Sequence, residues 1–445
     1  MTVIAKEPRA AFPPAEEPPG PPPGVAENNP KQVWQLLAAM VVIAALFLVA
    51  GLGDLLIFIL ILIVIVMLHE LGHFATAKWA GMKVTEYFVG FGPRLWSVRR
   101  GETEYGVKAL PLGGYVRITG FTVMDEVSEE DEPRAYRQQP FWKRIIVASA
   151  GSAMHFLIAL VLAAIMVFSY GVATNNAQVT GLDHWVGVAH TPAQLAGLRA
   201  GDTIVSFDGK ALKSPTSLVT DIQRSTGQTI TLGVVRNGSL RSIQVTPRDG
   251  KGIVVDDATG KQKLTDKGYI GVSLNGATQS LGFFSIFSNA ADTVGSATSA
   301  EVSGIVTTFS PSGLSSVLHQ VTNAKDAEKV AKDPGSQARP VSLVGIANLG
   351  VQAQKAGLQS VLELLILINI VFGLLNMLPM LPLDGGHVAV AAYEWIRTRK
   401  GQPYYRADIT KLFPVVVLFL AFLAVFVFAG VFLDFTHPLQ NPFSP

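Results

Sequence analysis

Residues 55–73 read LLIFILILIVIVMLHELGH, an aliphatic run that ends in two histidines and a glutamate. In a helix, His69 and His73 lie on one face, so both imidazoles can reach one Zn²⁺. Glu70 lies beside them, where it can take a proton from the water molecule that the metal activates. Placing these three polar side chains at membrane depth is costly unless they face a cavity or a metal. The stretch therefore predicts a zinc site in a membrane helix.

This HExxH pattern is only a moderate signal when it stands alone, because five residues with three fixed positions recur by chance. The alternative interpretation is a surface helix with two incidental histidines. The fourteen consecutive apolar residues at 55–68 make a water-exposed helix a poor alternative, so we favour the zinc site.

The composition of the chain is that of a membrane protein. Of its 445 residues, 49% are apolar and only 15% are charged, and the mean hydropathy is +0.37. A soluble surface of this size would carry fewer apolar residues. The absence of cysteine excludes disulfides, thiolate metal ligands and cysteine nucleophiles. A net charge of +2 gives no reason to expect nucleic acid as a partner.

Five segments are long and apolar enough, or nearly so, to form transmembrane helices, which need about 20 residues each. They cover about 33–52, 55–68 with its continuation HELGHFATA, 145–170, 358–378 and 413–433. Only GLGD separates the first two, so one long broken segment is an alternative. The sequence thus predicts a polytopic α-helical membrane protein with about five transmembrane helices.

The distribution of Lys and Arg predicts the orientation of these helices. Residues 76–144 hold eleven basic residues and 393–411 hold five, whereas 51–54 and the tail after Leu433 hold none. We therefore expect the N-terminus and both basic segments to be cytoplasmic and residues 173–357 to be extracytoplasmic. The expected location is the cell membrane.

Local patterns divide the rest of the chain. Residues 94–118 alternate apolar and polar residues around Gly101 and Gly113, which predicts a cytoplasmic β-hairpin or three-stranded meander. Runs such as TIVSFDG and TITLGVVRNG predict a small extracytoplasmic α/β domain. The predicted parts are a disordered Pro-rich cytoplasmic tail (1–30), three helices with the β-region (31–175), the α/β domain (176–275), a linker or helical segment (276–340), two helices (341–435) and a tail (436–445).

A catalytic zinc ion needs three protein ligands and an open position, so one ligand is still missing. Asp384 is our candidate because it is the only acid between positions 364 and 393, near the end of an apolar segment. Pro379 and Pro382 break that segment, and Gly385 with its glycine neighbour lets backbone approach closely, so a carboxylate can point inward. The alternative is that Asp384 caps the next helix.

Three further polar residues are candidates with weaker roles. His387 is a rival zinc ligand, although its spacing from Asp384 favours a supporting or helix-start position. Asn376 could bind a substrate carbonyl or the oxyanion, or equally satisfy a backbone carbonyl freed by the prolines. His155 stands alone on a face of small residues and is interpreted as packing.

Four separated motifs now occur in one order: HELGHF at 69–74, VGFGP at 89–93, YGVKALPLGGYV at 105–116 and NMLPMLPLDGGH at 376–387. Together they resemble the bacterial site-2 proteases, and most of all the actinobacterial regulators of intramembrane proteolysis. The resemblance covers about 55–275 and 340–435. The Pro-rich tail and the 33–52 helix are additions to the family core.

The resemblance implies an intramembrane zinc metalloendopeptidase, with His69, His73 and Asp384 as Zn²⁺ ligands and Glu70 as general base. It implies that 94–118 is a membrane-associated β-region near the active site. GLRAGDTIVSFDGKAL, at 197–212, resembles part of a PDZ domain, so the α/β domain is expected to be PDZ-like and to bind a peptide. Expected substrates are transmembrane helices of membrane proteins, such as anti-sigma factors or signal-peptide remnants.

Two other functions fit some of these residues. A catalytically silent scaffold could bind partners through the PDZ-like domain, but a structural zinc ion would not need Glu70. A zinc or proton conduit would also place histidines and an acid in the membrane, but the other predicted helices carry few ionisable residues. The PDZ-like domain itself could either capture a newly cut C-terminus or exclude bulky extracellular domains.

Overall fold

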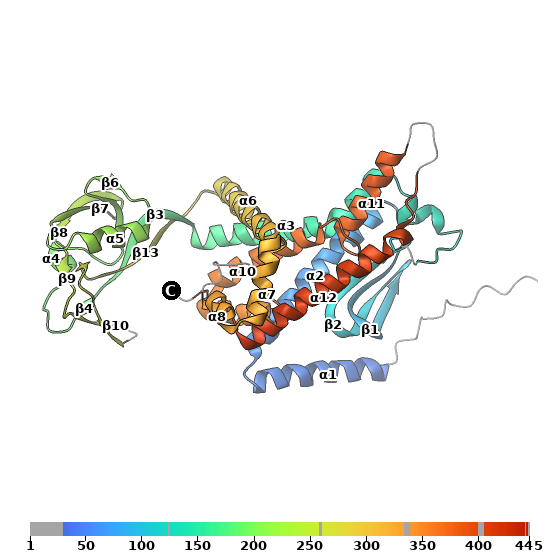
Figure 1. The fold of residues 1–445 in the computed structure, drawn as a ribbon, viewed down its shortest axis with the longest axis horizontal. Helices are drawn as coiled ribbons and strands as arrows, with labels where there is room; N and C mark the ends of the chain where they lie inside the picture. The colour runs from blue at the N-terminus through green and yellow to red at the C-terminus, as the bar shows by residue number, and fades with distance from the viewer. Residues whose placement is uncertain are drawn as a thin grey trace, which may run out of the picture. The chain divides into compact units, whose positions relative to one another are not determined.

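The computed structural model of the chain describes residues 30–122, 125–257, 260–332, 339–398, 405–440 and 442–443. Contacts between Cα atoms divide the chain into two units, Met1–Val147 and Ala148–Pro445 (Figure 1). The predicted disordered tail lies outside the described residues, apart from Pro30.

The first unit contains the HExxH helix and a β-sheet. Its elements are α1 (Pro30–Val49), α2 (Gly53–Trp79), β1 (Val84–Arg100), β2 (Thr103–Ile118), the 3₁₀ turns η1 (Glu132–Arg134) and η2 (Tyr136–Gln138), and the start of α3 (Phe141–Tyr170). With 27 residues at 1.5 Å each, α2 is about 40 Å long, so the helix continues well past its aliphatic run.

The region predicted as β structure at 94–118 is β structure, but the sheet begins earlier, at Val84. Both strands bend, so that Tyr87–Val89 pairs with Tyr105–Val107 on one side and with Gly114–Val116 on the other. Val84 and Phe88 are buried in the sheet, at the even spacing of a strand with one covered face. That spacing is the sequence signal for the earlier start.

The second unit contains a compact α/β domain within residues 172–279, where the sequence predicts one at 176–275. Its five-stranded path runs in the order β13-β3-β5-β7-β8, with β6 paired to β5. The strands and helices are β3 (Val172–Leu182), β4 (His184–Trp185), α4 (Pro192–Ala196), β5 (Thr203–Phe207), β6 (Lys210–Ala211), α5 (Pro215–Arg224), β7 (Ile230–Arg236), β8 (Ser239–Val245), β9 (Arg248–Asp249), β10 (Val254–Asp257), β11 (Gly260–Lys263), β12 (Gly268–Tyr269) and β13 (Val272–Gln279).

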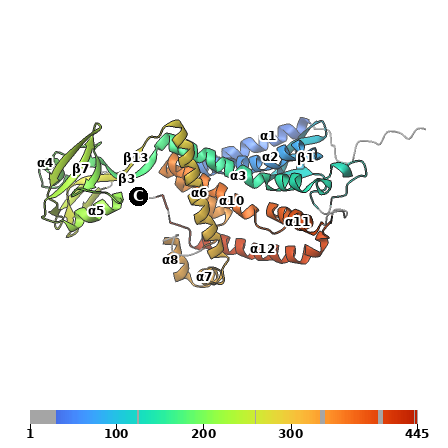
Figure 2. The same ribbon diagram turned by 90° about the horizontal axis from the view of Figure 1, so that it is seen from above.

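This domain has its own core and one edge where the chain both enters and leaves. Leu218 of α5 packs with Ile204 and Leu232 of the sheet, and all three side chains are fully buried. The first strand, β3, pairs antiparallel with the last strand, β13 (Figure 2). The preceding helix α3 and the following helix α6 are therefore joined to the domain at the same edge.

The rest of the second unit is helical. It begins with the remainder of α3. The helices that follow are α6 (Phe283–Thr308), α7 (Pro311–Thr322), α8 (Ala324–Lys332), α9 (Leu343–Ala356), α10 (Leu358–Asn376), α11 (Asp384–Arg397), η3 (Ile409–Leu412) and α12 (Phe413–Thr436). The segment predicted as a linker or helical region thus carries α6 to α8.

Four helices among the described residues are long and apolar enough to cross a membrane: α2, α3, α10 and the segment Ile409–Thr436. The chain is accordingly a multi-pass membrane protein. The apolar part of α1, Leu37–Val49, is shorter than a span requires, so the fifth transmembrane helix stays a prediction.

Helices α3 and α10 are joined by a buried polar pair. His155 Nδ1 lies 3.0 Å from Asn369 Oδ1, and Asn369 Nδ2 donates to the Leu365 carbonyl at 2.8 Å. Both polar side chains are at most 2% exposed. His155 is thus a packing residue that also has a hydrogen-bond partner, as a polar group between membrane helices requires.

In the α/β domain, Asp202 is almost fully buried and binds Arg236 through both carboxylate oxygens, at 2.6 and 2.7 Å. The Arg236 bonds hold the pKa of Asp202 below its usual value. A carboxylate with a lowered pKa stabilises the fold above the unfolded pKa, about 3.9, and the stabilisation is lost as pH falls through the folded value.

Asp202→Asn should therefore lower the unfolding midpoint of the α/β domain near neutral pH by at least about 4 °C, because the Arg236 charge loses its partner. Thermal pulse proteolysis of the full-length protein in detergent, with fragments of 172–279 followed by mass spectrometry, measures this. Asp266→Asn alters an exposed carboxylate of the same domain and should leave the midpoint unchanged. Equal midpoints for the two variants would contradict a stabilising pair.

Candidate metal centre

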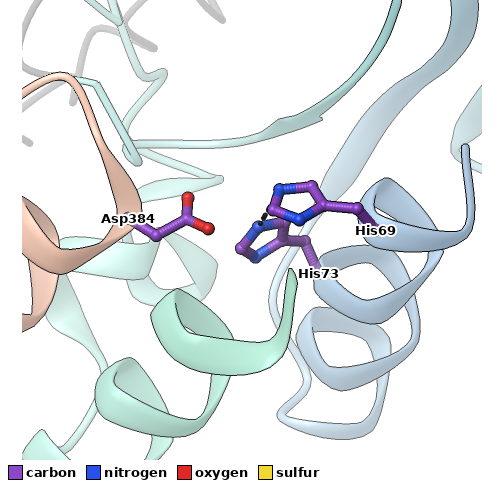
Figure 3. A group of neighbouring side chains, drawn as sticks. All are labelled: His69, His73 and Asp384. Atoms are coloured by element: carbon purple, nitrogen blue, oxygen red, sulfur yellow. Dashed lines mark hydrogen bonds between the residues drawn. The ribbon is translucent and has the colours of Figure 1, made fainter. Parts of the chain in front are cut away.

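His69 and His73 lie on successive turns of α2, and both imidazoles are buried (Figure 3). The ring centroids are 4.9 Å apart, and the two Nε2 atoms are 3.3 Å apart. Two imidazole ligands of one tetrahedral zinc ion, each about 2.0–2.1 Å from the metal, are also separated by about 3.3 Å. The histidine pair has the spacing that a single zinc ion needs.

A backbone carbonyl fixes the orientation of His73. The Nδ1 atom of this ring lies 2.7 Å from the Val147 carbonyl oxygen, which can only accept a hydrogen bond. We therefore assign the ring proton to Nδ1, which leaves the lone pair on Nε2, facing His69. A ring held through its second nitrogen is the usual arrangement of a metal-binding histidine.

The β-sheet holds the glutamate of the motif. The backbone N–H of Val116, in β2, donates to Glu70 Oε2 at 3.1 Å. The strand can come this close to α2 because residue 114 is glycine: a Cβ there would lie 2.3 Å from Met67 Sδ and 3.1 Å from the Phe88 carbonyl oxygen. Sequence reasoning missed this contact, since a backbone N–H has no residue signature.

A tyrosine reinforces the same contact between sheet and helix. The Tyr87 hydroxyl donates to the Met67 carbonyl at 2.8 Å, one turn before Glu70. Burial, together with the charge of Glu70, raises the pKa of Tyr87 to about 12. The hydroxyl therefore keeps its proton and remains a donor at neutral pH.

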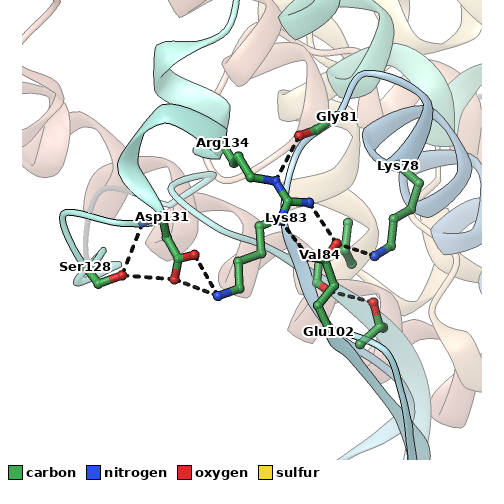
Figure 4. Close-up of polar contacts among 9 residues, drawn as sticks. Lys78, Gly81, Lys83, Val84, Glu102, Ser128, Asp131 and Arg134 are labelled. Carbon is green, nitrogen blue, oxygen red and sulfur yellow. Dashed lines mark hydrogen bonds and ion pairs between the residues drawn. The ribbon is translucent and has the colours of Figure 1, made fainter.

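The turn between β1 and β2 is attached to the end of α2 by Glu102 (Figure 4). Lys78, in the last turn of α2, binds the Glu102 carboxylate at 2.6 Å, and Arg134 binds it through two nitrogens at 2.7 and 3.0 Å. The Arg134 and Lys78 bonds lower the pKa of Glu102 to about 2. Lys83 and Asp131 form a second ion pair beside this one, at 2.7 Å.

Asp384 begins α11, after a turn that ends α10 at Asn376 as the two prolines predict. The N-cap of α11 is Leu383, and no side-chain capping bond is present, so Asp384 is not the capping residue of the alternative interpretation. A Cβ at Gly385 would lie 2.2 Å from the Met377 carbonyl oxygen. The glycine therefore permits the tight backbone approach that the sequence predicts there.

The remaining candidates occupy less distinctive positions. Asn376 is the last residue of α10 and is half-buried, and His387 is buried in the first turn of α11. Asn369, which sequence reasoning passed over, is the buried amide of α10 and binds His155. An amide in the middle of an apolar helix was the signal that could have identified it.

Comparisons with known proteins agree with this chemistry. The sequence model of peptidase family M50 matches residues 57–423. Zinc metalloprotease Rip1 of Mycolicibacterium smegmatis is 32% identical over 421 residues, which cover 88% of this chain and 98% of that protein. Zinc metalloprotease Rip1 of Mycobacterium tuberculosis is 31% identical over 407 residues, or 86% and 97% of the two chains. The solved PDZ domain of an SdrC-like protein from Listeria monocytogenes matches 23% of this chain and 90% of its own, with 22% identity and a TM-score of 0.17.

The Glu102 contacts predict that Glu102→Gln loosens the sheet. Loss of the carboxylate charge should speed backbone hydrogen exchange in β1 and β2 about fivefold, which corresponds to about 1 kcal/mol for a partly exposed ion-pair network. Glu129→Gln, at an exposed position in the same unit, is the matched control.

In the unaltered protein the same contacts should persist well below pH 4.3, the usual pKa of a glutamate, and fail only as pH falls toward 2. Equal exchange in Glu102→Gln and Glu129→Gln would show that the ion pairs do not hold the turn.

Proposed function

This chain belongs to peptidase family M50, and on that premise we propose that it cleaves transmembrane segments with His69, His73 and Asp384 as zinc ligands. Family membership and relatives named as zinc metalloproteases make it a zinc-dependent metalloendopeptidase of the membrane. The observation that carries the site is the 3.3 Å separation of the two imidazole Nε2 atoms on a membrane helix.

The donor set fits zinc in its catalytic form. Two imidazole nitrogens and one carboxylate oxygen, from the residues drawn in Figure 3, are a known three-ligand set that leaves a coordination position open. When bound, zinc supplies a water molecule whose pKa is about 7 and an electrophile for the scissile carbonyl.

Glu70 is the proposed general base. Its carboxylate takes one proton from the attacking water as the oxygen bonds to the scissile carbonyl carbon, and it passes that proton to the leaving amine nitrogen as the C–N bond breaks. The Val116 N–H bond fixes the position of this carboxylate against β2. Glu70→Gln keeps the size of the side chain and removes its ability to accept the proton.

The substrate presents a second problem, because a transmembrane helix hides its peptide bonds in its own hydrogen bonds. Unwinding it in hydrocarbon costs several kcal/mol for each unpaired backbone group. In an antiparallel strand, the backbone N–H and C=O groups of residues two apart point to the same edge of the strand. The N–H of Val116 points to Glu70, so the backbone groups of Gly114 point to the same edge of β2. An extended substrate that adds to this edge would lie beside the general base.

We further infer the orientation and partners. The basic residues of 76–144 and 393–411 favour a cytoplasmic β-sheet, which puts the α/β domain outside the cell. The resemblance favours anti-sigma factors or signal-peptide remnants as substrates. It also favours a PDZ-like role for the α/β domain, with a peptide as its ligand.

Glu70→Gln should lower cleavage of a model transmembrane substrate in detergent by about 10²- to 10⁴-fold, the usual contribution of a general base. Bound zinc, measured by elemental analysis, should stay near one ion per chain. Glu363→Gln is the matched control, since this acid is exposed on another membrane helix, α10.

Asp384→Asn should instead lower the zinc content itself, and chelator should abolish cleavage by the wild type. Wild-type activity in Glu70→Gln would remove the general base from the mechanism. Unchanged zinc affinity in Asp384→Asn would remove the third ligand.

The unwinding step predicts a dependence on the substrate. Replacing two central leucines of the model transmembrane helix with glycine or asparagine should raise kcat/KM, because each breaker lowers the cost of exposing the peptide bond. Cleavage rates in detergent for the all-leucine and the interrupted helix, at matched length, measure this effect. An all-leucine helix that is cut as fast would exclude unwinding as a barrier.

A further inference from the structure

A groove of about 450 Å³ lies between α11 and the start of α12. This volume is within the usual range of small-ligand sites, about 300–1,000 Å³. Its walls are mainly apolar and include Met380, Leu381, Val390 and Val415, while a few polar residues line its rim. No part of the proposed chemistry uses this groove.

The surroundings of the groove select an apolar occupant. Along the first turns of α12, Phe413, Val415 and Leu418 are 61%, 50% and 71% exposed. In a chain that spans the membrane, such side chains face lipid. A groove that opens among them is in contact with hydrocarbon, so an acyl chain can fill it without leaving the membrane interior.

The rim of the groove selects the charge of the occupant. The Arg397 guanidinium lies over the rings of Tyr393 and Tyr405, at 5.7 and 5.4 Å from their centroids, and both tyrosines line the groove. Lys411 also lines it, with a side chain that is 81% exposed and 3.6 Å from Asp408. Among the described residues, the groove is thus lined by Lys411 and one exposed carboxylate, Asp408, and Arg397 lies against two of its lining tyrosines.

Arginine, lysine and tyrosine beside an apolar groove are the combination that recognises an anionic headgroup at the membrane surface. We propose that this groove binds one anionic phospholipid, with an acyl chain between α11 and α12 and the phosphate at Lys411 and Arg397. The inference does not depend on the proposed peptidase mechanism.

Because of the position of the groove, a bound lipid should stabilise the turn that precedes α11. Pro379, Met380 and Leu381 form one wall, and Gly386 is a further contact, so the groove adjoins the turn that carries Asp384. A bound acyl chain packs against that turn and limits its motion. Lipid binding should therefore raise the thermal stability of this segment.

Native mass spectrometry of the full-length protein in detergent, with palmitoyl-oleoyl phosphatidylglycerol or phosphatidylcholine added, tests the proposal. We expect one tightly retained phosphatidylglycerol molecule per chain. Ala389→Trp, which fills the groove, should weaken its retention at least tenfold. Val425→Trp, at a lipid-exposed position further along α12, should have no effect.

A second substitution tests the proposed headgroup contact, and it keeps the experiment valid if the tryptophan perturbs folding. Lys411→Glu alters an exposed side chain and should weaken phosphatidylglycerol binding about tenfold or more, with no change for phosphatidylcholine. Lys263→Glu, on the α/β domain, is the charge-matched control. Equal retention of the two lipids, or unchanged binding in both groove variants, would overturn the proposal.

A photo-crosslinking amino acid at position 389 identifies the occupant directly. Crosslinks to phosphatidylglycerol in a membrane preparation support the proposal. Crosslinks to a transmembrane peptide instead of lipid would overturn it and assign the groove to substrate.

Discussion

Two imidazoles and a carboxylate must be held in place directly after a long apolar run of one helix, and the first unit is organised around that constraint. Polar side chains at membrane depth are expensive, so each needs a partner that also fixes its direction. His73 is hydrogen-bonded to the Val147 carbonyl, and Glu70 accepts a hydrogen bond from the Val116 N–H. Both partners are backbone groups, which cannot swing away as a side chain can, so the histidine and the base stay oriented before any substrate arrives.

Close backbone approach is the second requirement, and a glycine pair meets it beside each carboxylate of the proposed site. Gly114 lets β2 lie against α2 near Glu70, and Gly385 lets the start of α11 lie against the end of α10 beside Asp384. The local sequences are PLGG at 111–114 and PLDGG at 382–386. In both places a Cβ would collide within 2.3 Å of a neighbouring atom. Both glycines thus serve close packing, and the constraint is stricter at Gly385, where the neighbouring atom belongs to the backbone.

Helical spacing alone was enough to predict the face shared by His69 and His73, because i and i+4 coincide in any helix. The break before Asp384 was also predictable, from proline and glycine chemistry. The contacts that hold these residues were not, because their partners are distant in sequence. The Val116 N–H carries no signature, Glu102 meets Arg134 across 32 residues, and His155 meets Asn369 across 214. The zinc ligand set and the number of membrane spans remain predictions.

The Val116 bond also constrains how a substrate can use the sheet edge. A strand added there would normally receive a hydrogen bond from each outward-facing N–H. The Val116 N–H is already given to Glu70, so the substrate carbonyl opposite it receives no bond from the strand. In the proposed mechanism this carbonyl lies next to the general base and is left for polarisation by the metal. The absence of this one backbone hydrogen bond would then distinguish the scissile peptide from its neighbours, which are hydrogen-bonded to the edge of β2.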